Sequence, residues 1–116
     1  GDPLGDLGLT VAYWNELGEP AAGEGRLFRE PITALPGFPG SDELVAEYER
    51  ASGRDVSALG FWVACAYWKI AIIVEGVYAR YQAGVMGTTD PAAFEGFRTN
   101  VERLAAAARA AVERMP

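Results

Sequence analysis

The sequence predicts an all-α fold of about four helices together with one long Gly/Pro-rich loop. Apolar side chains recur at spacings of three and four residues over most of the chain, which is the period of amphipathic helices. Capping residues, Asp-Pro pairs and glycines mark the ends of these stretches. The chain has 116 residues, of which 50% are hydrophobic, enough for one compact domain with a modest core. We therefore expect a single helical domain over residues 1–116.

The first helix is expected to begin at Asp2, an N-cap candidate that is followed by proline at the first helical position. It is expected to end within residues 15–18. Its predicted inner face consists of Leu4, Leu7, Val11 and Trp14. Residues 15–40 hold five glycines and four prolines and keep no helical or strand period. The apolar residues within 31–40 predict an ordered lid on the surface, with a flexible spacer as the alternative.

The middle of the chain predicts two further helices. Ser41 is the expected N-cap of the second helix, and Gly53 is its expected C-terminal glycine. The third helix is expected to follow Ser57 as its N-cap and to run to about Gln82, with Gly84 as the stop. Apolar residues surround this helix almost completely, which is typical of a central, buried helix.

The fourth helix is expected to begin at the Asp90-Pro91 pair, which repeats the cap-then-proline signal. Its predicted apolar stripe consists of Phe94, Phe97, Val101, Leu104, Ala108, Val112 and Met115. Ion pairs of i,i+4 spacing are expected on its outer face, namely Arg98–Glu102 and Arg109–Glu113.

Composition excludes several classes of function. The net charge of −6, from 16 acidic and 10 basic residues, argues against nucleic-acid binding and slightly favours a cationic or polyhydroxylated ligand. The absence of histidine excludes a Ser-His-Asp triad, a Cys-His dyad and most zinc sites. The single cysteine, Cys65, is expected to be a buried structural thiol and is typical of a reducing, cytoplasmic location.

Membrane insertion is not expected from the sequence. The longest apolar run, residues 59–74, contains Lys69 and is followed by Glu75. The acidic, Gly-rich start has neither the basic nor the apolar region of a signal peptide.

Glu75 directly follows the apolar run 59–74. An acid in an apolar neighbourhood is expected either to be paired or to line a cavity, which makes Glu75 a candidate site residue.

Aromatic residues are dense in this chain: Tyr13, Trp14, Trp62, Tyr67, Trp68 and Tyr78. Aromatic residues at helical spacing belong to a core more often than to a ligand site. Trp14 is the expected exception, because it adjoins the long loop.

Residues 1–8 read Gly-Asp-Pro-Leu-Gly-Asp-Leu-Gly. They resemble the segment that follows the metal-binding acidic motif in phosphotransferases of the aminoglycoside phosphotransferase and choline kinase superfamily. The likeness is greatest to the branch related to the kinase-like domain found next to acyl-CoA dehydrogenase domains. Residues 69–81, with a basic residue, an aliphatic run and Glu-Gly-x-x-Ala-Arg, resemble a second motif of that branch. Pro-Gly-Phe-Pro at 36–39 and residues 52–55 continue the similarity in order.

The resemblance implies the helical subdomain of a kinase-like carboxy-terminal lobe. It implies that Asp6 accepts hydrogen bonds from the backbone of a catalytic loop and holds that loop rigid. It also implies an acceptor pocket among the helices, with Glu75, Trp14 and Tyr78 as candidate substrate-binding residues. The alternatives are a dipole-compensating role for Asp6 and a structural salt bridge from Glu75 to Arg80 or to a residue outside the chain.

The family's catalytic residues do not lie in this sequence, since there is no histidine for its His-x-Asp loop and no acidic motif before residue 1. The chain alone is therefore expected to lack kinase activity, metal and cofactor, whereas the complete parent protein is expected to use ATP and Mg²⁺. The expected partners are the remainder of that protein and a small-molecule acceptor, and the isolated chain is expected to form a homodimer through exposed apolar faces.

Two alternatives to the phosphotransferase interpretation remain open. One is a free-standing helical protein-interaction module. The other is a domain associated with acyl-CoA dehydrogenases, although no residues indicate a flavin site.

Overall fold

The computed structural model describes residues 1–14 and 32–115. Its elements are helix α1 (Pro3–Tyr13), a 3₁₀ turn η2 (Ile32–Ala34), helices α2 (Ser41–Ser52) and α3 (Leu59–Gln82), a second 3₁₀ turn η3 (Pro91–Ala93) and helix α4 (Glu95–Glu113). All regular elements in these described ranges are helical, so the predicted all-α fold of about four helices is confirmed. Most of the Gly/Pro-rich loop, residues 15–31, lies outside the described residues.

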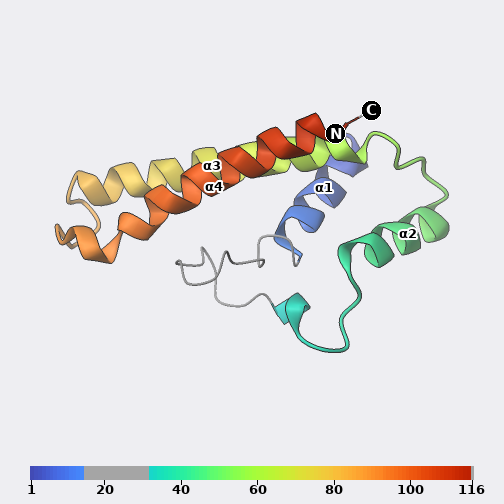
Figure 1. Ribbon diagram of the computed structural model, residues 1–116, viewed down its shortest axis with the longest axis horizontal. Helices are drawn as coiled ribbons and strands as arrows, with labels where there is room; N and C mark the ends of the chain where they lie inside the picture. The colour runs from blue at the N-terminus through green and yellow to red at the C-terminus, as the bar shows by residue number, and fades with distance from the viewer. Residues whose placement is uncertain (15–31, 116) are drawn as a thin grey trace.

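Helices α3 and α4 form a long antiparallel pair, and α1 packs across the N-terminal half of α3 (Figure 1). The core lies along these two contacts. Ile70 on α3 and Leu104 on α4 are 1% and 2% exposed, and burying a side chain of this size stabilises a fold by about 1.5–3 kcal/mol. The other buried apolar residues of this core are Val11, Ala12, Val63, Ala64, Ala66, Tyr67, Ala71, Val74, Ala108 and Ala111.

The predicted start of α1 is confirmed. The Asp2 carboxylate accepts a hydrogen bond of 2.9 Å from the Leu4 amide, and Pro3 occupies the first turn, where its missing N–H costs nothing. The helix buries Leu4, Leu7 and Val11, three of the four residues of the expected inner face. It ends at Tyr13, before the expected residues 15–18, so the fourth residue, Trp14, lies just beyond the helix and is half-buried.

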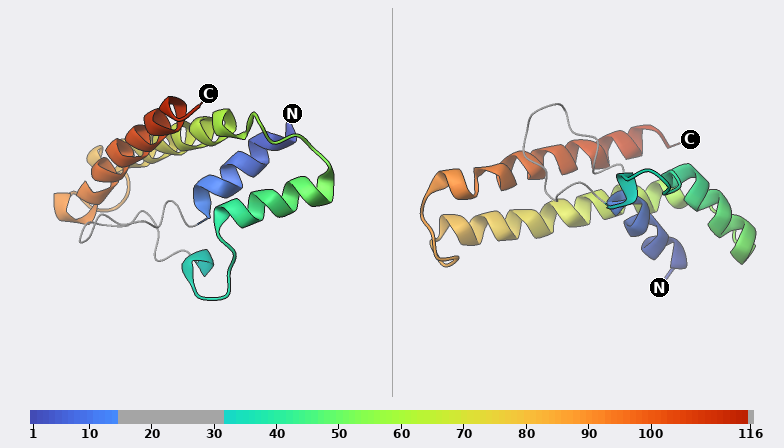
Figure 2. Two further views of the ribbon diagram at one scale, coloured as in Figure 1. Left: turned by 45° about the vertical axis from the view of Figure 1, so that its right-hand side comes forward. Right: turned by 90° about the horizontal axis from the view of Figure 1, so that it is seen from below.

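Helix α2 lies at the same end of the molecule as α1 (Figure 2), and its Val45 packs partly buried against the core. None of its residues is buried. Its N-cap is Gly40 and Ser41 is its first helical residue, so the predicted N-cap is wrong by one position. Gly53 ends the helix as expected, with a φ of +67° that glycine adopts without strain.

The predicted N-cap of α3 is also wrong, because the helix follows Ala58 without a side-chain cap. Ser57 is engaged elsewhere: its amide and hydroxyl donate to the Asp55 carboxylate at 2.8 and 2.9 Å. These bonds, the backbone one first, lower the pKa of Asp55 below its usual value. The predicted end of α3 is confirmed, with Gln82 as its last residue and Gly84 at a φ of +76°.

One side of α3 is exposed, which corrects the expectation of a buried central helix. Trp68, Ile72 and Ile73 are 62%, 52% and 54% exposed. The physical reason is that α1 and α4 are its main packing partners among the described residues, and they cover one side. By length and composition alone α3 could cross a membrane, although its apolar run was judged too interrupted from the sequence; a core helix of a soluble protein passes the same test.

The turn into α4 departs from the prediction. Asp90 accepts a bond of 3.1 Å from the Ala92 amide, but this cap opens η3 rather than α4. Phe94 breaks the helix with a φ of −139°, because its ring is buried and stacked on Tyr81 with 5.5 Å between centroids. On α4, Ala111 is buried and the expected core residue Val112 is exposed.

Both expected ion pairs on α4 are confirmed. The Arg98–Glu102 pair is 3.5 Å apart and the Arg109–Glu113 pair is 2.9 Å apart. All four side chains are largely exposed, so each pair contributes only a few tenths of a kcal/mol, about 0.3–0.5.

Residues 32–40 are tethered to the end of α1. The Trp14 indole donates to the Pro39 carbonyl at 2.8 Å, and the Thr33 hydroxyl donates to the Trp14 carbonyl at 2.6 Å. The expectation that apolar side chains of this segment pack down is wrong for Ile32, Leu35 and Phe38, which are exposed. The tether is therefore polar rather than hydrophobic.

Close approach of α1 to α3 depends on a glycine. A Cβ at Gly8 would lie 2.7 Å from the Trp62 carbonyl carbon and 2.8 Å from its oxygen. These are backbone atoms, which cannot move away as a flexible side chain could. By contrast, a Cβ at Gly76, in the interior of α3, would meet nothing within 4 Å.

We predict opposite effects for two Gly→Ala substitutions. Gly8→Ala should destabilise the protein by about 1–3 kcal/mol, because overpacking outweighs the better helix propensity of alanine. Gly76→Ala should stabilise it by up to about 1 kcal/mol, since only the propensity term applies. Urea unfolding of both variants measures the difference, and equal stabilisation would contradict the described packing of α1.

Candidate functional site

A small pocket lies between α1 and α3 and contains the first sequence-predicted site residue, Asp6. We call it the α1–α3 pocket; its volume is about 230 Å³. It is lined by Gly5, Asp6, Leu9, Trp62, Cys65, Ala66 and Lys69. Gly5 and Gly8 allow the two helices to approach closely. A Cβ atom at Gly5 would lie 3.4 Å from the ring of Trp62. The glycines of the first motif thus place Asp6 opposite α3.

The carboxylate of Asp6 is available in this pocket. Its backbone carbonyl accepts a bond from the Thr10 hydroxyl at 2.9 Å. Within the described residues, however, its carboxylate makes no hydrogen bond or ion pair, and the same holds for the Lys69 ammonium. A carboxylate and an ammonium on one small pocket can bind a group that carries both a donor and an acceptor, such as a peptide backbone.

Glu75 lies farther along α3. It is exposed, it lines neither of the two pockets described in this section, and it pairs with no residue in the described ranges. The expected salt bridge to Arg80 is therefore not formed in the described part of the chain. Glu75 is six residues beyond Lys69, which corresponds to about 9 Å along a helix.

The structure places Tyr78 and Trp14 in structural contacts. Tyr78 is 9% exposed, and its hydroxyl accepts a bond of 3.0 Å from the Gln82 amide group. Its ring lies 6.0 Å from that of Phe94. Trp14 is half-buried at the end of α1 and bonds Pro39. The four sequence-predicted residues are thus spread over α1 and the distal half of α3 rather than gathered at one point.

Sequence reasoning missed two features of the α1–α3 pocket. Cys65 was expected to be a buried structural thiol, but it is half-buried and lines the pocket. Lys69 was noted as an interruption of an apolar run and as the basic residue of the second motif, but not as a neighbour of Asp6. Its spacing of four residues from Cys65 was the available signal, because i,i+4 residues share a helix face.

A larger groove lies between α2 and the body formed by the other helices. We call it the α2 groove; its volume is about 680 Å³. Its apolar lining comes from all four helices and includes Val11, Val45, Ala46, Leu59, Phe61, Val63, Ala111 and Met115. Its polar lining consists of Ser41, Asp42, Glu49, Ser57 and Arg114. No sequence-predicted site residue lies in this groove, because it arises from the separation of α2, which no local pattern encodes.

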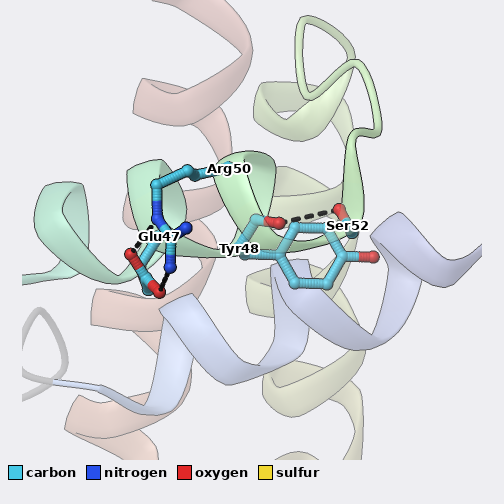
Figure 3. Close-up of polar contacts among 4 residues, drawn as sticks. All are labelled: Glu47, Tyr48, Arg50 and Ser52. Atoms are coloured by element: carbon cyan, nitrogen blue, oxygen red, sulfur yellow. Dashed lines mark hydrogen bonds and ion pairs between the residues drawn. The ribbon is translucent and has the colours of Figure 1, made fainter.

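Polar contacts within α2 join residues of its second half, as Figure 3 shows. Arg50 donates to Glu47 through its Nε at 2.8 Å and through a second nitrogen. This pairing lowers the pKa of Glu47 and raises that of Arg50. The Ser52 hydroxyl donates to the Tyr48 carbonyl at 2.7 Å.

The described residues contain no group of three histidine, cysteine, aspartate or glutamate side chains that could hold a metal ion.

Comparison with known proteins shows similarity to proteins named Acyl-CoA dehydrogenase family member 11. The chicken protein (Gallus gallus) is 36% identical over 87 residues, and the orangutan protein (Pongo abelii) is 32% identical over 93 residues. These matches cover 72% and 78% of this chain but only 11% of each relative, so the chain corresponds to a small part of their length. No family model and no solved structure matches the chain.

We predict that Asp6→Ala barely changes the stability of this chain. Its carboxylate has no bonded partner in the described residues, so only its favourable position near the helix N-terminus is lost, at a cost of less than about 1 kcal/mol. Thermal unfolding of the wild-type and variant chains tests this. A loss above about 2 kcal/mol would show that Asp6 is a structural residue of the chain itself.

Proposed function

We propose that this chain is the substrate-binding helical subdomain of a small-molecule phosphotransferase with a kinase-like fold, and that it is inactive alone. The observation that carries the proposal is the free Asp6 carboxylate in the α1–α3 pocket. An ionised acceptor that is fixed on a helix but unpaired in its own chain suits a residue whose donors lie on another segment. A catalytic loop is such a segment.

The names of the two relatives support this proposal, because they fit the branch of the kinase-like superfamily that the first motif resembles. The first motif resembles the kinase-like domain found next to acyl-CoA dehydrogenase domains, and both relatives carry acyl-CoA dehydrogenase in their names. ATP and Mg²⁺ would then belong to the catalytic part of the complete protein. Its location would be cytoplasmic. Glu75 keeps an unpaired carboxylate that can hold a hydroxyl or amine of the phosphate acceptor, with Trp14 and Tyr78 as further candidate contacts.

A phosphotransfer assay on the longer gene product tests the proposal. We expect a His-x-Asp-x-x-x-x-Asn loop and an acidic motif encoded before residue 1, ATP-dependent phosphorylation of a small hydroxyl or amine compound by the long protein, and none by residues 1–116. Asp6→Ala should lower kcat of the long protein by up to about 100-fold, because a misplaced catalytic loop loses alignment.

The control for that assay is Glu43→Ala, which removes an exposed acid of α2 that lines neither pocket. It should leave kcat unchanged. ATP turnover by residues 1–116 alone would overturn the proposal, and so would full activity of the Asp6→Ala long protein.

A free-standing interaction module is the second candidate, favoured by an exposed apolar stripe on α3. The stripe consists of Phe61, Trp68 and Ile72, which are each about half exposed, at 49%, 62% and 52%. Their spacings of seven and four residues place them on one helix face. Large apolar side chains exposed along one helix face are typical of a protein contact.

We predict that the isolated chain forms a homodimer through this stripe. Light scattering coupled to size exclusion should give a dimer mass at high concentration, and Trp68→Ser with Ile72→Ser should give a monomer. Val85→Ser, which removes an equally exposed apolar side chain outside α3, should leave the dimer intact. A wild-type monomer at high concentration would contradict the prediction.

A further inference from the structure

The α2 groove has the size of a ligand site. Its volume of about 680 Å³ lies within the range of about 300–1,000 Å³ that small-molecule sites occupy. It shares no lining residue with the α1–α3 pocket. A proposal for a ligand in the α2 groove therefore does not depend on the proposed phosphotransferase role.

The groove is apolar because α2 packs only loosely on the body, through the partly buried Val45. Val45 on α2 faces the groove together with Phe61 and Val63 on α3, yet no α2 residue is buried. Apolar side chains that line an open groove remain in contact with water. A ligand with an apolar body would remove that surface from water, which is favourable in proportion to the area covered.

Three charged residues line the groove, and two of them have a local explanation. Asp42 lies in the first turn of α2, where an acid compensates the helix dipole. Arg114 follows the last residue of α4, where a cation compensates the opposite end. Neither charge requires a ligand.

Glu49 has no such explanation. It lies in the last turn of α2, where a negative charge is unfavourable. The adjacent Arg50 bonds Glu47 (Figure 3). Within the described residues the Glu49 carboxylate has no hydrogen bond or ion pair. It is therefore an unpaired anion at the edge of an apolar groove.

We propose that the α2 groove binds a small organic amine with an apolar body. The ammonium pairs with the Glu49 carboxylate at the groove edge, where it stays partly hydrated. The apolar body lies between Val45 of α2 and Phe61 and Val63 of α3. Charge selects the amine, since the lining carries two acids and one base, and the base lies at the end of α4.

Three eight-carbon probes that differ only in their head group test this proposal: octylamine, octanol and octanoate, each below its micellar concentration. Binding is followed by the amide chemical shifts of residues 41–63 and 111–115. We expect octylamine to bind several-fold tighter than octanol, and octanoate to bind weakest. Shortening the amine by one methylene should weaken binding about fourfold.

Two pairs of matched variants locate the contact. Glu49→Gln should reduce the affinity of octylamine to that of octanol, whereas Glu43→Gln, on α2 but outside the groove, should not change it. Ala46→Phe fills the groove and should abolish binding of all three probes. Ala51→Phe, an equally exposed alanine of α2 that does not line the groove, should retain it.

Several results would overturn the proposal. Tightest binding of octanoate would show that Arg114 selects the ligand. If Glu43→Gln and Glu49→Gln weaken octylamine binding equally, the affinity depends on the net charge of the protein and not on a contact with Glu49. Absence of binding by every probe, or shifts confined to Trp68 and Ile72 of α3, which lie outside the groove, would show that the groove is no ligand site. Circular dichroism of each variant confirms that it is folded.

Discussion

The contact between Gly8 and the backbone of Trp62 is the constraint on which the N-terminal half of the structure depends. A helix that approaches another this closely must present a residue without a Cβ at the crossing point, and Gly8 does so. Leu4, Leu7 and Val11 then reach the surface of α3 and become buried. The same contact turns Asp6 toward Cys65 and Lys69, so the packing that stabilises α1 also builds the α1–α3 pocket.

Helix α3 takes part in all three surfaces for which a function is proposed. It lines the α1–α3 pocket with Cys65 and Lys69, its first turns form one wall of the α2 groove, and Trp68 and Ile72 remain exposed, while its other side packs on α1 and α4. This division follows from its sequence, since a helix that is apolar almost all round has more faces than two neighbours can cover. Its buried side contributes to the stability of the fold, and its other sides stay exposed.

The sequence predicted what local chemistry determines and failed where distant residues decide. Asp2 caps α1 and Gly53 ends α2 as expected, because both act on backbone groups only a few residues away. Phe94 breaks the predicted start of α4 because its ring is buried against Tyr81, a contact that no local pattern contains. The α2 groove was missed for the same reason, since the separation of α2 is a property of the whole fold. Asp6 and Lys69 were each found in a motif, but their common pocket became visible only in three dimensions.

Gly8 and Gly76 lie in different surroundings, although both are glycines within helices. Both lie within helices, where glycine costs about 1 kcal/mol relative to alanine. At Gly8 the chain itself provides the reason, because the backbone of α3 fills the space. At Gly76 nothing in the described residues lies near the missing Cβ, and the glycine adjoins the unpaired Glu75. Glycine at position 76 lowers the stability of the helix and makes room for no described residue of the chain. It is therefore consistent with a backbone or ligand that approaches α3 from outside. Both proposed roles of the chain, as a subdomain beside a catalytic segment and as an interaction module, require such a neighbour on this helix.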